Sequence, residues 1–135
     1  MTVPAAASRE ATAVAPHQLS VFELSYIGDA VYELWCRQHV LKAHTKAKEV
    51  NRAVFKWVRC QTQAAIVERW LADAQLDDTE VAIFQRGRNH RPNSKPKHAT
   101  VKEYRTATGF ECLVGYWFLS GSERFECLMD QVAVV

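Results

Sequence analysis

The sequence predicts an all-α fold. Apolar residues recur at helical spacing through most of the chain, helix-starting patterns recur between them, and no segment alternates apolar and polar residues for more than a few positions. With 135 residues, of which 48% are hydrophobic, the chain is long enough for one domain with a substantial core. We expect residues 1–18 to form a flexible tail and residues 19–135 to form the domain.

The N-terminal half predicts four helices. Ser20 and Glu23 match a capping box, in which each residue's side chain accepts a hydrogen bond from the other's backbone N–H. They open a first helix over about residues 20–42, with apolar residues at helical spacing. The other signals are Thr45 as the cap of a second helix, residues from about 61 to 74 as a third, and Asp78 as the cap of a fourth.

The C-terminal half predicts a loop and two helices. Residues 89–99 contain two prolines and almost no apolar residue, which is typical of a loop. Thr100 and Glu103 form a second capping box, which opens a helix to about Leu119. The remaining signals are Gly121 as the end of that helix and Ser122 as the cap of a last helix through Val132.

Two predicted helices each place a single acid among apolar and small residues: Asp29 within residues 24–32, and Glu111 within residues 108–117. An unpaired buried carboxylate costs several kcal/mol, and neither helix offers Lys or Arg one turn from its acid. A shared Mg²⁺ is one solution, because Mg²⁺ takes one or two protein carboxylates and engages substrate phosphates. The alternative is that both acids lie at a helix surface or pair with a distant Arg.

Two glycines lie inside the same predicted helices. Gly28 and Gly115 each cost roughly 1 kcal/mol relative to Ala in a helix interior. Such positions usually mark the close approach of another backbone or a ligand. A small residue at an ordinary helix crossing explains them equally well.

Positive charge is concentrated in one segment. Residues 85–105 contain seven Lys or Arg and one acid, a charge of +6, so the rest of the chain carries −4 to give the net +2. Such a segment suits a phosphate backbone, although a solvated loop is the alternative. Tyr104 is its single aromatic residue, which favours phosphate contacts with a duplex over stacking on single strands.

The sequence does not support a zinc protein, a membrane protein or a secreted protein. Cys36, Cys60, Cys112 and Cys127 form no CxxC pair and no HExxH motif occurs, so we expect reduced thiols and no zinc site. The longest apolar stretch, residues 112–119, is too short to span a bilayer. The N-terminus lacks the features of a secretory signal, so a cytoplasmic protein is expected.

Two motifs resemble those of the ribonuclease III family. Residues 24–33 (LSYIGDAVYE) resemble its signature helix, and residues 106–116 (TATGFECLVGY) resemble its second acidic motif. The resemblance covers about residues 20–133. Three further stretches resemble the short Mini-ribonuclease III form, which lacks a double-stranded-RNA-binding domain: residues 84–89 (FQRGRN), 96–97 (PK) and 104–105 (YR).

The resemblance implies a helical homodimer in which each Mg²⁺-dependent site cuts one strand of an RNA duplex, leaving 5′-phosphate and 3′-hydroxyl ends. Mn²⁺ is an expected substitute for Mg²⁺. By motif position, Asp29 and Glu111 match the family's catalytic, metal-binding carboxylates. Ser25 and Thr108 stand where the family has a Glu and an Asp, which leaves the number of metal ions open. The implied substrate is the precursor of 23S ribosomal RNA.

We expect the basic segment to bind RNA, and two other functions remain as alternatives. One is an inactive ribonuclease III-like protein that binds RNA or the ribosome. The other is an all-α nucleotide pyrophosphohydrolase, which usually needs clustered acids such as ExxE that neither motif supplies. The expected RNA-binding residues are Arg86, Arg88, Asn89, Lys95, Lys97, Tyr104 and Arg105.

Overall fold

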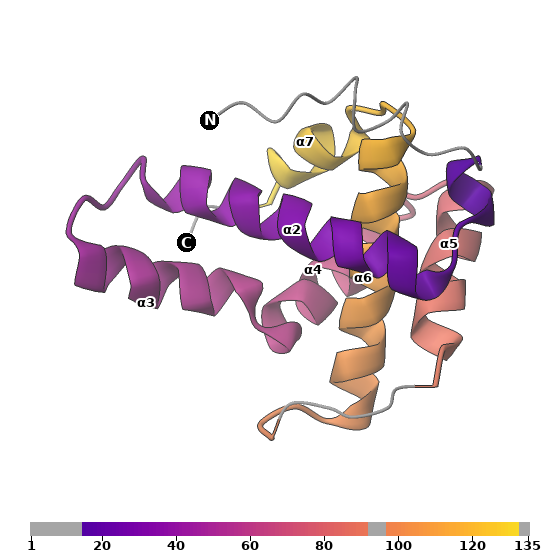
Figure 1. Cartoon of the computed structure of the whole chain (residues 1–135), viewed down its shortest axis with the longest axis horizontal. Coiled ribbons are helices and arrows are strands. Elements are labelled where there is room, and N and C mark those ends of the chain that lie inside the picture. The colour runs from indigo at the N-terminus through magenta and orange to yellow at the C-terminus, as the bar shows by residue number, and fades with distance from the viewer. Residues whose placement is uncertain (1–14, 92–96, 133–135) are drawn as a thin grey trace.

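The computed structural model describes residues 15–91 and 97–132, and all regular secondary structure within these ranges is helical (Figure 1). The predicted all-α fold is therefore confirmed. The elements are the 3₁₀ helix η1 (Pro16–Gln18) and the α-helices α2 (Val21–Val40), α3 (Ala47–Val58), α4 (Cys60–Ala72), α5 (Asp78–Asn89), α6 (Val101–Leu119) and α7 (Arg124–Met129). No helix of the described chain has the length and apolar character to cross a membrane.

The two predicted capping boxes are confirmed. The Glu23 N–H donates to Ser20 Oγ at 3.1 Å, and the Ser20 N–H donates back to Glu23 Oε1 at 3.1 Å. Thr100 and Glu103 form the same pair of bonds at the start of α6. Gly121 follows the end of α6 with φ 73°, the left-handed conformation of a helix C-terminus.

Two other predicted caps are wrong. Helix α5 is capped by Asp77, one residue before Asp78, because the extended backbone of Asp77 lets its carboxylate accept the Glu80 N–H at 2.8 Å. Helix α3 has Lys46 at its N-cap position and no side-chain cap, so Thr45 does not fill this role.

The last helix is shorter than predicted and does not reach Val132. Ser122 does not serve as its N-cap, although its Oγ accepts the Arg124 N–H at 3.1 Å. Helix α7 is held by buried Glu80, whose carboxylate accepts bonds from the Arg124 guanidinium at 2.8 and 2.9 Å and from Trp117 Nε1 at 2.7 Å. This network joins α5, α6 and α7.

The structure also differs from the expected tail boundary. Helix η1 lies inside the segment expected to be flexible, while residues 1–14 lie outside the described residues. The Arg86 guanidinium donates to the backbone carbonyls of His17 at 2.9 Å and Leu19 at 2.6 Å. An arginine distant in sequence therefore holds η1 against α5.

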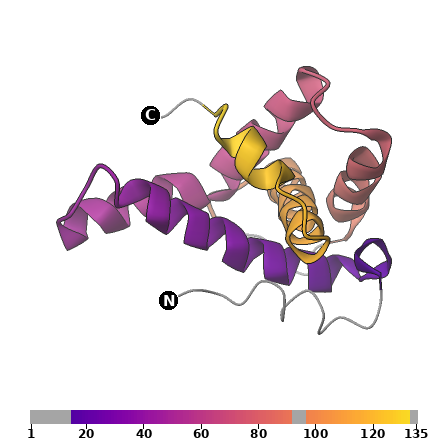
Figure 2. The same cartoon turned by 90° about the horizontal axis from the view of Figure 1, so that it is seen from above.

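Helix α6 is the central element of the fold. Figure 2 shows it nearly end-on, with α2, α4, α5 and α7 around it. Residues on all of its sides are buried, including Phe110, Leu113 and Trp117, as expected for a helix surrounded by others. The core of the protein is thus the set of side chains between α6 and its neighbours.

Helices α2 and α6 cross with their backbones in contact. A Cβ atom on Gly28 would lie 1.8 Å from the carbonyl oxygen of Glu111, and one on Gly115 would lie 2.0 Å from that of Leu24. Both distances are far below van der Waals contact, so no other residue type fits this crossing. The two interior glycines mark a close backbone approach, one of the interpretations that the sequence allowed.

We predict that Gly28→Ala destabilises the protein by roughly 1–3 kcal/mol, because the added methyl group must force α2 away from α6. Helix propensity alone predicts the opposite, a gain of roughly 1 kcal/mol. Urea unfolding measures the change, with Ala30→Gly at an exposed position of α2 as the control for propensity. A stabilised Gly28→Ala protein would contradict the proposed contact.

Candidate active site

Asp29 and Glu111 meet in one cleft. The cleft has a volume of about 280 Å³ and is formed by α2, the first residue of α4 and the N-terminal half of α6. Asp29 follows Gly28, whose contact with the Glu111 backbone brings the two acids together. Two acids that are 82 positions apart in the sequence therefore share a surface because of the helix crossing.

The two carboxyl groups differ in burial. Asp29 is exposed, whereas Glu111 is partly buried. Burial raises the pKa of Glu111 well above its usual value, and the charge of Asp29 and a hydrogen bond with it raise the pKa further. The Glu111 carboxylate is thus the costly charge of the site, and a cation placed between the two acids would stabilise it.

Gln63 is a site residue that the sequence analysis did not identify. It is 3% exposed, its Nε2 donates to the Val58 carbonyl at 2.8 Å, and its hydrogen bond with Glu111 favours the charged form of that acid. Its Oε1 is buried and has no hydrogen-bond partner among the described residues. The available signal was a polar residue on the apolar face of α4, where Ile66, Val67 and Trp70 follow at helical spacing.

The cleft holds two acids, with hydroxyl groups at two further positions. Ser25 and Thr108 also line it. Each hydroxyl is bonded to its own helix: Ser25 Oγ donates to the Phe22 carbonyl at 3.3 Å, and Thr108 Oγ1 donates to the Tyr104 carbonyl at 3.0 Å. The site therefore carries less negative charge than one with four carboxylates.

These groups fit a hard cation. The two carboxylates of the cleft are ligands that suit Mg²⁺, which takes one or two protein carboxylates and keeps several of its waters. A closed zinc site needs about four protein ligands of His, Cys or acidic type. Within residues 15–91 and 97–132, no group of three or more such side chains lies close enough to hold a metal.

Four of the seven expected RNA-binding residues lie in separate places or outside the described residues. The guanidinium of Arg86 is occupied by the carbonyls of His17 and Leu19, which gives it a structural role. Tyr104 lines the cleft of Asp29 and Glu111. Lys97 is exposed, and Lys95 lies outside the described residues.

The other three lie on the opposite flank of α6. Arg88, Asn89 and Arg105 line a second pocket, bounded by α4, α5 and α6. The Arg88 guanidinium lies over the Phe84 ring, 5.7 Å from its centroid, and Arg88 Nε donates to Asn89 Oδ1 at 3.4 Å. The basic segment is therefore divided between two places.

A pair of exposed aromatic residues borders the cleft. Phe22 and Tyr26 lie one turn apart on α2, with ring centroids 5.3 Å apart, and are 67% and 68% exposed. Both also line the cleft. Large exposed aromatic side chains next to a functional cleft are typical of an interaction surface.

Comparison with known proteins identifies the family. The family model of the Ribonuclease III domain matches residues 23–122. Mini-ribonuclease 3 of Desulfitobacterium hafniense is 42% identical over 117 residues, which are 85% of this chain and 73% of that protein. Mini-ribonuclease 3 of Enterococcus faecalis is 36% identical and covers 84% of this chain and 87% of that protein. The crystal structure of a Fusobacterium nucleatum protein superimposes with a TM-score of 0.76 at 28% identity, covering 85% of this chain and 92% of that one. The chain therefore belongs to the ribonuclease III family of endoribonucleases, and its relatives are the Mini-ribonuclease 3 proteins.

Proposed function

We propose that this protein is a Mg²⁺-dependent endoribonuclease that cleaves double-stranded RNA, with Asp29 and Glu111 as its metal-binding residues. The observation that carries the proposal is the meeting of these acids in one cleft, where burial and mutual repulsion raise the pKa of Glu111. Two ionised carboxylates without a cation between them repel each other and destabilise the fold. The nuclease activity in this proposal follows from membership of the ribonuclease III family.

Each side chain of the cleft has a role in this proposal. Asp29 and Glu111 bind the cation, and the Gln63 amide orients the Glu111 carboxylate. A bound Mg²⁺ would supply polarisation of a phosphate oxygen and activation of water, and the expected products carry 5′-phosphate and 3′-hydroxyl ends; Mn²⁺ is the expected substitute.

The proposed physiological substrate is the precursor of 23S ribosomal RNA, processed in the cytoplasm, and this part rests on the family resemblance. The second candidate function is an inactive RNA-binding protein of the same fold. It is favoured by Ser25 and Thr108, whose hydroxyls are bonded to their own helices. Retention of both Asp29 and Glu111 in one cleft favours the nuclease.

We predict that Asp29→Asn and Glu111→Gln each lower the cleavage rate by more than about 100-fold, since loss of an outer-shell group alone typically costs 10–100-fold. The assay incubates a long RNA duplex, and separately its single strands, with and without Mg²⁺. Glu33→Gln is the matched control, because Glu33 lies on the same helix but pairs with Arg37 at 2.9 Å. Near wild-type cleavage by either site variant would refute the metal assignment.

A second prediction concerns the metal-free protein. The pKa of Glu111 is raised on folding from a usual value near 4.5, so the unfolded chain releases this proton first. The contribution of Glu111 to stability must therefore fall as the pH rises above about 4.5. We expect Glu111→Gln to melt at a higher temperature than wild type at pH 7.5 in EDTA, and the gap to close near pH 4. A less stable Glu111→Gln protein at pH 7.5 would contradict the assigned cost.

We also propose that the protein is a homodimer joined through α2. Four large apolar side chains are exposed along α2 and at its C-cap residue, Leu41. They are Phe22, Tyr26, Leu34 and Leu41. A surface of this kind is usually covered in a soluble assembly. Sedimentation equilibrium at micromolar concentration should give a dimer for wild type and a monomer for Tyr26→Asp. A stable wild-type monomer would rule this interface out.

A further inference from the structure

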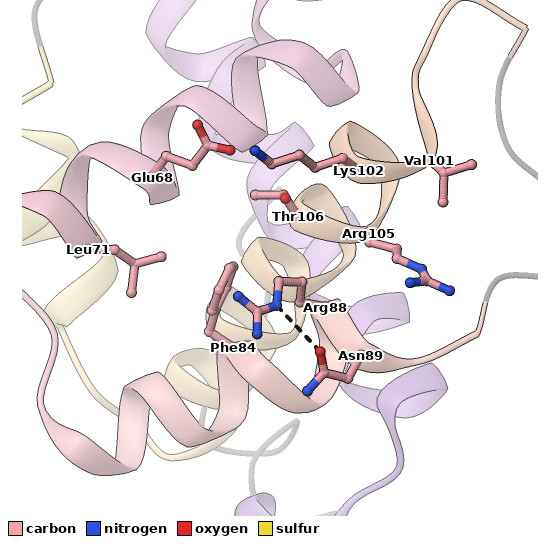
Figure 3. Close-up of a pocket in the computed structure, with 9 residues that line it drawn as sticks. All are labelled: Glu68, Leu71, Phe84, Arg88, Asn89, Val101, Lys102, Arg105 and Thr106. Carbon is pink, nitrogen blue, oxygen red and sulfur yellow. Dashed lines mark hydrogen bonds between the residues drawn. The ribbon is translucent and has the colours of Figure 1, made fainter.

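A second pocket lies between α4, α5 and α6. Figure 3 shows its lining, and its volume is about 520 Å³, within the range of small-ligand sites. Cationic and amide groups come from two of the helices: Arg88 and Asn89 from α5, and Lys102 and Arg105 from α6. Glu68 of α4 lies opposite Lys102 in this view and is the one acid of the lining.

This pocket is separate from the candidate active site. The two share no lining residue. Arg105 and Glu111 are six positions apart on α6, which places them about 9 Å apart along the axis and about 120° apart around it. Both sites nevertheless use the N-terminal half of α6, so a large ligand lying over that end can reach both.

The described protein neutralises the charge of the pocket only in part. Arg88, Lys102 and Arg105 against Glu68 give a net charge of +2. No ion pair joins any of these three cations to a described residue, in contrast to Arg69, which pairs with Asp73 at 2.9 Å. Uncompensated cations around a concave surface attract an anion.

Arg105 supplies a more specific indication. Its Nε atom is buried and has no hydrogen-bond partner among the described residues. Buried donors are nearly always paired, and leaving one unpaired typically costs about 1–3 kcal/mol. Arg88, on the other helix of the pocket, lies over the Phe84 ring, and its Nε donates to Asn89 Oδ1 at 3.4 Å, so these contacts restrict its orientation before binding.

We infer that this pocket binds a phosphate group of the RNA backbone at a point outside the active site. Arginine presents several N–H donors in a planar fork that matches phosphate oxygens, and a lysine adds a point charge. A phosphate contact of this type positions a duplex without reading its sequence. The inference rests on the proposed function, because it takes double-stranded RNA as the ligand.

The test measures duplex binding in a protein that carries Asp29→Asn, so that no cleavage occurs. In this background, Lys102→Gln with Arg105→Gln should weaken binding of unrelated duplexes about tenfold and reduce the salt dependence by about one phosphate contact. The matched control is Lys42→Gln with Lys46→Gln, in the connection between α2 and α3, which lies at the opposite end of the molecule from α5 (Figure 1). Glu68→Gln should tighten binding, since it removes the acid of the lining.

A second arm distinguishes the source of the phosphate. Inorganic phosphate and AMP should compete with the duplex for the pocket of the protein with native Lys102 and Arg105. This competition should be absent when both residues are replaced by Gln. If the double variant binds duplex with the affinity and salt slope of the control, the inference is wrong. Phosphate or AMP binding that the double variant loses, with duplex binding unchanged, would also overturn it, because the pocket would then be a site for free anions.

Failure of the inference is distinguishable from failure of the proposed function. Protein with native Asp29 is assayed for duplex cleavage in Mg²⁺, with and without the pocket substitutions. No cleavage by the wild type refutes the proposed function. Cleavage with the same KM for the wild type and the pocket variant refutes only the inference. Circular dichroism and melting temperature check that each variant is folded.

Discussion

The contact between the α2 and α6 backbones is the constraint on which the rest of the structure depends. Gly28 and Gly115 lie where any side chain would collide with the carbonyl of the facing helix. The same contact fixes how far apart Asp29 and Glu111 lie, because Asp29 follows Gly28 and the facing carbonyl belongs to Glu111 itself. Stability and function are therefore coupled at this crossing: a change that separates the helices also separates the two acids.

The chemistry of the cleft follows from unequal burial. Asp29 stays in contact with solvent, whereas Glu111 is close to α4 and Gln63, so most of the electrostatic cost of the site falls on one residue. A cation bound between the two carboxylates would attract both of them and so favour the ionised form of Glu111. With Ser25 and Thr108 bonded to their helices, the two acids remain as the protein ligands of the cleft. This small set is consistent with a weakly held Mg²⁺ that keeps several waters.

The sequence predicted what local chemistry determines and missed what packing determines. The capping boxes at Ser20 and Thr100 depend on residues three positions apart, and they form as expected. Asp77 and Asp78 can both cap a helix, and only the backbone conformation decides between them. Gln63 acts through a neighbouring helix, so nothing near it in the sequence reveals its partner. Arg86 was expected to bind RNA. Its two hydrogen bonds go to the carbonyls of residues 17 and 19, nearly 70 positions away in the sequence, so no local pattern predicts them.

The central claim is that the crossing of α2 and α6 forms a cation site from Asp29 and Glu111. The most direct measurement is the melting temperature at pH 7.5 as a function of Mg²⁺ concentration, for wild type and Asp29→Asn. A ligand that binds only the folded state raises its stability with concentration. The melting temperature of the wild type should rise with Mg²⁺ concentration, and this rise should be largely lost in Asp29→Asn. An equal rise in both proteins, or none in wild type up to millimolar Mg²⁺, would contradict it.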